Sequence, residues 1–335
     1  MDEQHYGGLL ARFKQARVMA VGDIYLDENV YGVVTEVSLE APIPVLEVHE
    51  RRYNPGAAGN AACNAAALGA KVYMVGVTGD DTNAGIVRRE FAVRNVDTTH
   101  IVTDPTRATN TYGKLRAGGH NIPVQEMLRT DTPKPTPIDG AAEEAVVANI
   151  RKLAPEVDAI MIGDQVSSTI TEKVLAAIVD CAKQYNLITL ADSRKRAGIF
   201  ARIDVVVPND KEAGLAAGID VVDEESLRAA GRALLKTARN ALVTRGPEGI
   251  TVFAADGTIE DVPIRPVQVV DVTGAGDTVA AAVLLTLCAG GSLHDAAFLG
   301  NLTAGIAVAQ EGVVTVSNEE ALEALKPDRY IQSDN

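Results

Sequence analysis

The sequence predicts an α/β fold: a doubly wound, mostly parallel sheet flanked by helices, with a small β-sheet lid made from two insertions. Three observations support this prediction. Short apolar segments alternate with helical stretches along most of the 335 residues, as in a parallel sheet covered on both faces. Hydrophobic residues make up 47% of the chain and aromatic residues only 4%, so a large core must rest on Ala, Val, Leu and Ile. Two stretches that alternate apolar with polar residues predict the lid.

The elements of the core follow from local apolar patterns in chain order. The predicted strands are Arg17–Gly22, Lys71–Val77, Ala159–Gly163, Leu187–Ala191, Val205–Val207 and Asn240–Thr244. The predicted helices are Ala58–Leu68, Asn83–Asn95, Gly140–Leu153, Thr171–Tyr185, Glu224–Leu235, Thr278–Leu287 and Leu293–Ala309. Ligands of such open sheets bind beyond the carboxyl ends of the strands, so loops that follow strands are the places to look for a site.

The lid is predicted from Tyr31 to Arg52 and from Thr109 to Asp131, with Gly118-Gly119 as the expected turn of the second stretch. Both stretches predict antiparallel strands outside the main sheet. The core then comprises residues 1–30, 53–108 and 132–335, and the lid comprises residues 31–52 and 109–131. We expect the polar tail after Lys326 to be frayed.

Charge and cysteine content argue against several classes of partner. The net charge of −14 disfavours nucleic acids and anionic membranes, which need a basic surface. Cys63, Cys181 and Cys288 lie far apart among apolar residues without metal-ligand spacing, which indicates buried thiols in a reducing cytoplasm. The longest apolar run, Val279 to Ala289, is too short to span a bilayer, and from the polar N-terminus we expect no signal peptide. We therefore expect a cytoplasmic protein that acts on a small molecule.

The stretch Asp271 to Asp277 is the most informative part of the chain. It follows a β-rich segment, Val267 to Val270, and runs straight into an apolar helical stretch. Gly274, Ala275 and Gly276 then occupy the first turn of a helix, where free N–H groups and the positive dipole end favour anions. Asp277 beside them could take a proton from an alcohol that attacks a phosphate. The alternative, favoured for an isolated motif, is a tight turn with Asp277 as a helix cap.

Other loops carry polar residues, each with a structural alternative. Asp27 could accept hydrogen bonds from two sugar hydroxyls or satisfy N–H groups of its own loop, and Asp23 can face the same crevice. Gly56 and Asn60 open a helix of small residues. Asn60 can donate to and accept from polyol groups, or the segment can serve helix–sheet packing.

Asn209 and Glu212 lie on one helical turn and could hold magnesium-bound water near nucleotide phosphates. A helix cap with its capping-box partner is the alternative that this pattern alone favours. Thr244 to Gly249 could be a nucleotide-facing loop or a hairpin turn. No Walker A pattern occurs, and the glycine motif comes too late in the chain for a dinucleotide-binding dehydrogenase.

Taken together, these residues resemble the ribokinase-like (PfkB) family of carbohydrate kinases, over about Val18 to Leu325. Two signature regions occur in the family's order, Pro55 to Gly69 and Asp271 to Asp277. The resemblance implies a sugar kinase that uses ATP and Mg²⁺. For the reaction it implies Asp277 as catalytic base and an anion hole at Gly274, Ala275 and Gly276. For the acceptor it implies sugar binding by Asp27, Gly56 and Asn60. For the nucleotide it implies magnesium and phosphate positioning by Asn209 and Glu212 (the metal through water), a site at Thr244, Gly246 and Thr273, and Asn301 near adenine or ribose.

Within the family, the chain looks most similar to heptose 7-phosphate kinases, the kinase half of ADP-heptose synthesis enzymes. The segments that carry this likeness are Gly22 to Asp27, Tyr31-Gly32, Ser38 to Val45, Gln125 to Asp131 and Asp271 to Thr278. It departs from the pattern at Gly56-Ala57, where the family has Gly-Gly, and at Gly163 to Ser168 and Asp192 to Lys195. No His-x-Gly-His motif occurs, so we expect no nucleotidyl-transferring domain.

The acceptor and the assembly stay open at this level. A phosphorylated acceptor would need basic anchors, and the candidates are Lys114, Arg116, Arg129, Arg194 and Lys195, each of which taken alone is more readily a solvated charge. A nucleoside kinase would stack its acceptor on Tyr31, Tyr53 or Tyr112, and a silent sugar sensor is a further alternative. The free strand edges of the lid predict pairing in a homodimer.

Overall fold

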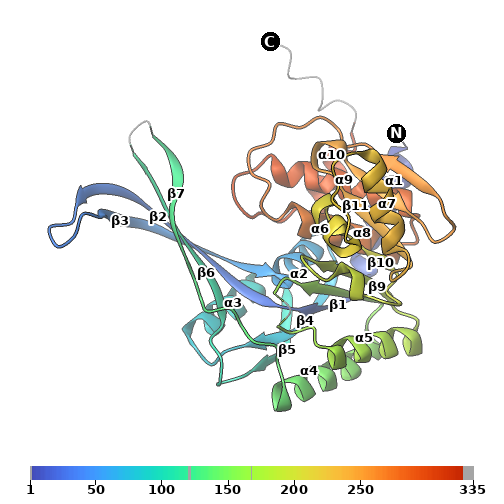
Figure 1. Ribbon diagram of the computed structural model, residues 1–335, viewed down its shortest axis with the longest axis horizontal. Helices are drawn as coiled ribbons and strands as arrows, with labels where there is room; N and C mark the ends of the chain where they lie inside the picture. The colour runs from blue at the N-terminus through green and yellow to red at the C-terminus, as the bar shows by residue number, and fades with distance from the viewer. Residues whose placement is uncertain (1, 120–121, 167, 327–335) are drawn as a thin grey trace, which may run out of the picture.

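The computed structural model describes residues 2–119, 122–166 and 168–326, which form a large body with a smaller sheet projecting from it (Figure 1). Within these residues the larger sheet has nine strands in the order β13-β12-β11-β10-β9-β8-β1-β4-β5. Their bounds are β1 Arg17–Gly22, β4 Lys71–Thr78, β5 Val96–Thr103, β8 Ala159–Asp164, β9 Ile188–Ser193, β10 Val205–Val206, β11 Asn240–Thr244, β12 Ile250–Phe253 and β13 Ile259–Val262. Neighbouring strands pair in parallel from β5 to β11 in this order. Among the described strands of this sheet, only the pairs β11–β12 and β12–β13 are antiparallel. The predicted mostly parallel sheet is confirmed.

Helices cover both faces of this sheet because successive strand side chains point to opposite sides. In β1, Val18 and Ala20 belong to one buried cluster, and Met19 and Val21 belong to the other. The first cluster contains α1 Glu3–Arg12, α2 Ala58–Ala67, α3 Thr82–Val93, α8 Ala275–Cys288, α9 Leu293–Val308 and α10 Asn318–Ala324. The second contains α4 Gly140–Leu153, α5 Glu172–Tyr185, α6 Asp210–Ala217 and α7 Glu224–Leu234. The architecture is therefore doubly wound, as predicted.

The smaller sheet has the strand order β3-β2-β6-β7. Its bounds are β2 Ile24–Val37, β3 Pro44–Ala57, β6 Asn110–Gly119 and β7 Ile122–Asp131. Each of the two stretches pairs antiparallel within itself, and β2 and β6 join them in parallel. Local alternation predicts the strands but not this long-range parallel pairing. Because β2 begins directly after Asp23 and β3 runs into α2 without a connecting loop, the small sheet grows out of the core.

Two local predictions are wrong. Residues 267–270 form no strand, because Pro263 and Pro266 remove backbone donors from this segment. The N–H groups of Val270 and Asp271 donate instead to the carbonyl oxygen of Val308, at 2.7 and 3.2 Å. Gly118 and Gly119 belong to β6 rather than to a turn, because the pairing with β7 continues to Gly119 and Ile122. The tail after Lys326 lies outside the described residues.

Two further expectations concern membranes and thiols. In the described part of the chain, no helix has the length and apolar character needed to cross a bilayer. Cys63 and Cys181 are buried and Cys288 is half-buried, and all three are free thiols.

Candidate active site

The segment before α8 is held in place by its own side chains. Oδ1 of Asp271 accepts hydrogen bonds from the N–H and the hydroxyl of Thr273 at 2.9 and 2.7 Å, and its Oδ2 accepts from the Gly312 N–H at 3.2 Å. Gly274 precedes the helix with a φ of 84°, a left-handed conformation that L side chains disfavour. A Cβ at Gly274 would also lie 2.8 Å from Nδ2 of Asn60. The turn therefore needs glycine for both conformation and space.

Asp277 lies half-buried in the first turn of α8, and its Oδ2 accepts a hydrogen bond from Nδ2 of Asn60 at 2.7 Å. Burial raises the pKa of Asp277 to about 6, the hydrogen bond from Asn60 and the charge of Arg194 oppose this rise, and the charges of Asp27 and Glu212 add to it. Such a carboxylate is mostly ionised at neutral pH yet binds a proton more strongly than an ordinary aspartate. These are the properties of a general base.

The contact between Asp277 and Asn60 joins α8 to α2, and a second polar pair supports it. Asn64 lies one turn after Asn60, donates to its carbonyl oxygen at 3.0 Å, and accepts through Oδ1 from the hydroxyl of Thr278 at 3.0 Å. Asn60, Asn64 and Thr278 are buried in helices that are mostly apolar, so these bonds fix how the two helices align. The roles of Asn64 and Thr278 were not predicted from the sequence. The available signal was two asparagines four residues apart in an Ala-rich helix.

A polar cavity of about 140 Å³ opens in front of Asp277. The predicted residues that line it are Asp27, Gly56, Asn60, Lys114, Arg129, Arg194, Thr273 and Gly274, and the cavity is completed by Tyr25, Ala57, Tyr112, Gln165 and Val313. Burial raises the pKa of Asp27, while the charges of Lys114, Arg129 and Arg194 lower it. A Cβ at Gly56 would lie 3.1 Å from the carboxylate of Asp27, so a glycine there leaves room for that group. The predicted sugar-binding residues thus converge on one cavity.

An apolar cavity of about 530 Å³ lies against the same helical turn. Gly274 and Asp277 line the polar cavity, whereas Ala275 and Gly276 line the apolar one, so the first turn of α8 separates the two. The predicted nucleotide-site residues Thr244, Gly246 and Asn301 line the apolar cavity, with aliphatic walls from Ile250, Ile264, Val267, Val269, Val272, Val279, Ala304 and Val308. Its volume lies within the range of small-molecule sites, roughly 300–1,000 Å³. A planar base with an attached sugar suits such a lining.

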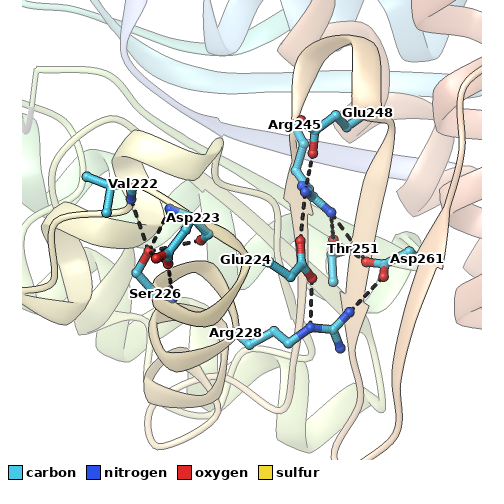
Figure 2. Close-up of polar contacts among 9 residues, drawn as sticks. All are labelled: Val222, Asp223, Glu224, Ser226, Arg228, Arg245, Glu248, Thr251 and Asp261. Carbon is cyan, nitrogen blue, oxygen red and sulfur yellow. Dashed lines mark hydrogen bonds and ion pairs between the residues drawn. The ribbon is translucent and has the colours of Figure 1, made fainter.

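The loop that carries Thr244 and Gly246 is fixed by an ion-pair network (Figure 2). Arg245 lies 2.9 Å from Glu224 and 3.5 Å from Asp261. Arg228 bridges the same two carboxylates at 2.7 and 2.8 Å. The positive charge of Arg245 is therefore paired with carboxylates of α7 and β13. The loop lines the apolar cavity with Thr244, Gly246, Pro247 and Gly249 rather than with a cation.

Asn209 and Glu212 form the helix cap that the pattern alone favours. Oδ1 of Asn209 accepts from the Glu212 N–H, and Oε2 of Glu212 accepts from the Asn209 N–H, both at 2.9 Å. A backbone bridge pairs Asn209 with Thr244, so this cap lies beside the apolar cavity. Burial raises the pKa of Glu212, and burial together with the charges of Asp277 and Glu212 raises that of Asp192.

The charge of Glu212 raises the pKa of both Asp192 and Asp277, and carboxylates grouped in this way suit a divalent cation. Mg²⁺ is usually held by one or two carboxylates together with waters and phosphate oxygens. In the described ranges, no three His, Cys, Asp or Glu side chains are grouped to hold a metal by themselves. A magnesium ion near Glu212 and Asp192 would therefore be shared with a nucleotide.

Two sequence expectations about charged residues need correction. Asp23 faces no crevice: its side chain is fully buried and accepts hydrogen bonds from the N–H groups of Gln165, Val166 and Thr169. It holds the loop after β8, since a buried carboxylate must be satisfied by nearby donors. Arg194 lines the polar cavity, whereas its neighbour Lys195 lines neither cavity.

Two of the three tyrosines that a nucleoside acceptor would stack on are already engaged. Tyr112 stacks on Tyr25 with ring centroids 4.5 Å apart, and the guanidinium of Arg129 lies 4.5 Å from the Tyr112 centroid. Arg52 lies 4.8 Å from the ring centroid of Tyr31. Cations therefore already cover faces of two of the three rings.

The family model for pfkB family carbohydrate kinases matches residues 15–321. Bifunctional protein HldE of Geobacter metallireducens is 35% identical over 325 residues, which cover 96% of this chain and 65% of that protein. HldE of Hyphomonas neptunium is 36% identical over 326 residues, covering 95% and 65%. The chain thus spans just under two thirds of the length of these relatives.

Solved structures with the same fold include Arabidopsis thaliana ribokinase complexed with ribose and ATP, with a TM-score of 0.71 and 19% identity over 93% of this chain and 99% of that one. Phosphofructokinase-2 from Escherichia coli in complex with substrates and products has a TM-score of 0.73 and 18% identity over 92% and 98%. At such identities the likeness concerns the fold alone.

Proposed function

Because the chain belongs to the pfkB family of carbohydrate kinases, phosphotransferases that act on sugar hydroxyls, we propose that it uses ATP to phosphorylate a sugar or a sugar phosphate. Heptose 7-phosphate is the first acceptor to test. One observation carries the proposal: Asp277 lies on the helical turn that separates a polar cavity from an apolar one. An acceptor in the first cavity and a nucleotide in the second would meet at this turn.

The reaction assigns a distinct task to each group around the turn. The acceptor oxygen attacks the γ-phosphorus, its proton passes to Asp277, and the bond to the β–γ bridging oxygen breaks. Because Asn60 holds Oδ2 of Asp277, we assign Oδ1 to the acceptor. The N–H groups of Gly274, Ala275 and Gly276 stabilise the charge that develops on the transferred group, for which the Ala275 N–H must leave the Val272 carbonyl oxygen to which it donates at 3.3 Å.

Substrate binding divides between the two cavities. Asp27 binds acceptor hydroxyls, with Gly56 and Asn60 beside it, and Lys114 and Arg129 favour its ionised form. Adenine and ribose occupy the apolar cavity next to Thr244, Gly246 and Asn301, and Thr273 lies near the phosphates. Magnesium, held by Glu212 through water, would neutralise phosphate charge.

Release of ADP across a panel of acceptors tests the proposal. The panel contains heptose 7-phosphate, fructose phosphates, ribose, ketodeoxygluconate and nucleosides. Asp277→Asn should lower kcat on the order of 10²–10⁴-fold for the best acceptor while leaving its binding intact, because only the base is lost. An unchanged kcat would reject the role of Asp277. Sugar binding without ADP release from any acceptor would instead favour a silent sensor.

We also propose that the small sheet pairs with that of a second copy. It carries exposed apolar side chains, namely Val33, Val37, Val48, Met127 and Leu128, and its outer strands β3 and β7 have free edges. Light scattering should give the mass of a dimer, and the double change Met127→Lys and Leu128→Lys should shift it toward the monomer. A monomer at all concentrations would contradict this assembly.

A further inference from the structure

A cationic cavity of about 300 Å³ adjoins the polar cavity on the side of the small sheet. The two cavities share Lys114, Thr273 and Val313, so an acceptor that enters one can extend into the other. The residues that distinguish the cationic cavity are Tyr31, Arg52, Arg94 and Arg116. None of the functions described above uses it.

The strand pairing explains why the lining changes along the small sheet. Alternate residues of a strand face the same side, and β2 pairs with β6 in the register Asp27–Tyr112, Asn29–Lys114 and Tyr31–Arg116. All six of these residues line one or both cavities. At about 3.3 Å per residue, Tyr31 and Arg116 stand roughly 13 Å beyond the level of Asp27, and a long Arg side chain can reach back part of that distance. The surface therefore passes from a carboxylate that suits hydroxyls to a set of cations.

Two of the four cations that line the cationic cavity are ion-paired. Arg94 pairs with Glu90 at 2.6 Å, and Arg52 pairs with Glu50 at 2.8 Å. Lys114 and Arg116 form no ion pair with any described carboxylate. Two acids, Asp271 and Glu311, also line the cavity; Asp271 accepts hydrogen bonds from Thr273 and Gly312, and the nearby charge of Arg116 helps to lower its pKa.

One atom points to a missing partner. Nε of Arg116 is buried without a hydrogen-bond acceptor, and it is the single side-chain nitrogen or oxygen in this state among the described residues. Buried donors are nearly always satisfied, and leaving one unsatisfied is unfavourable, so this donor indicates an acceptor that binds there. The planar guanidinium presents its donors as a fork that fits phosphate oxygens.

We propose that the cationic cavity binds the phosphate monoester of an acceptor that is already phosphorylated, with Arg116 as the main ligand and Lys114 and Arg52 beside it. This proposal rests on the proposed function. It also fixes an orientation: the existing phosphate lies at the end of the acceptor remote from the hydroxyl that faces Asp277. Arg116 then decides the preference for phosphorylated over unphosphorylated acceptors.

The variant Arg116→Gln tests this role because it removes the charge and the fork while keeping a polar chain. The measurement is the ratio of kcat/KM for a sugar phosphate to kcat/KM for the same sugar without its phosphate. Loss of a charged hydrogen bond predicts that this ratio falls roughly 10- to 100-fold through KM, with partial recovery in Arg116→Lys. Arg51→Gln is the matched control, since Arg51 lies on the same sheet, pairs with Glu28 and lines neither cavity. It should leave the ratio unchanged.

Inorganic phosphate provides a second measurement, which needs no unphosphorylated substrate. It should compete with the phosphorylated acceptor, and its inhibition constant should rise by a similar factor in Arg116→Gln. A ratio and an inhibition constant that stay unchanged in this variant would overturn the proposal. Inhibition or activation by phosphate that does not compete with the acceptor would assign the cavity to a separate anionic effector and overturn it too. A wild-type protein that releases no ADP with any acceptor would instead refute the proposed function.

Discussion

The polar and the apolar cavity meet at one helical turn, yet they are built in opposite ways. The polar cavity collects side chains from β2, β6, β7 and α2 and from the loop after β9, and it carries charges of both signs. The apolar cavity is assembled from residues 244–308 and is mostly aliphatic. A site of hydrogen bonds and charges discriminates strongly because an unmatched group is left unpaired, whereas an apolar site discriminates weakly. Acceptor choice should therefore depend on the polar cavity and on the cationic cavity beside it, and the apolar cavity should mainly set the affinity for ATP.

The largest effect is expected where the two cavities touch. Gly274→Ala forces an L residue into the left-handed region and places a Cβ 2.8 Å from Asn60, so it displaces the partner of Asp277. We expect kcat to fall on the order of 10²-fold, as for an ångström-scale misplacement, and stability to fall by about 1–2 kcal/mol. Steady-state kinetics and thermal unfolding measure both changes.

Gly276→Ala is the control for stability, because a Cβ at Gly276 meets no atom within 4 Å. It should unfold within about 0.5 kcal/mol of the wild type. A Gly274→Ala enzyme with wild-type kcat would show that the shared turn does not couple the two cavities.

A smaller and more selective effect is expected from Ala304→Leu, which adds volume to the wall of the apolar cavity. Overpacking by about 1–3 kcal/mol predicts that KM for ATP rises roughly 10-fold or more, while KM for the acceptor stays the same. Gly305→Ala on the same helix enters open space and serves as the control. Equal changes in both KM values would mean that the cavities are not separate sites.

The smallest effect concerns pH. Since the pKa of Asp277 is about 6, kcat/KM should fall with decreasing pH through about 6 as the base becomes protonated. The hydrogen bond from Asn60 lowers this pKa, so Asn60→Ala should raise it. The acid limb, the part of the pH profile where kcat/KM falls with decreasing pH, should then move to higher pH, and the loss of activity should be clearest below pH 7. Thr278→Val removes the bonds from the Thr278 hydroxyl to Asn64 and to the Gly274 carbonyl oxygen but keeps the bond from Asn60 to Asp277, so the acid limb should stay in place. A limb that does not move in Asn60→Ala would refute the link.

How far the sequence predicts these features depends on how local they are. The glycine turn and Asp277 lie within seven consecutive residues, and the strands and helices of the core follow from local apolar patterns, so both were predictable. The β-rich composition of residues 267–270 was misleading because Pro263 and Pro266 prevent regular pairing.

Features that depend on the docking of distant elements were not predictable. The bond between Asn60 and Asp277 exists because α2 packs on α8, 217 residues apart in the chain. The parallel pairing of β2 with β6, which brings Arg116 beside Tyr31, leaves no mark in either strand. Asp23 and Asp27 illustrate the same limit: both are acidic residues after one strand, yet only Asp27 reaches the polar cavity.

The direct passage of β3 into α2 has a mechanical consequence. The ribbon that carries Gly56 continues through Ala57 into the helix that carries Asn60. Because no loop separates this strand from the helix, a displacement of the small sheet would also displace Asn60. Such a displacement would change the hydrogen bond from Asn60 that lowers the pKa of Asp277.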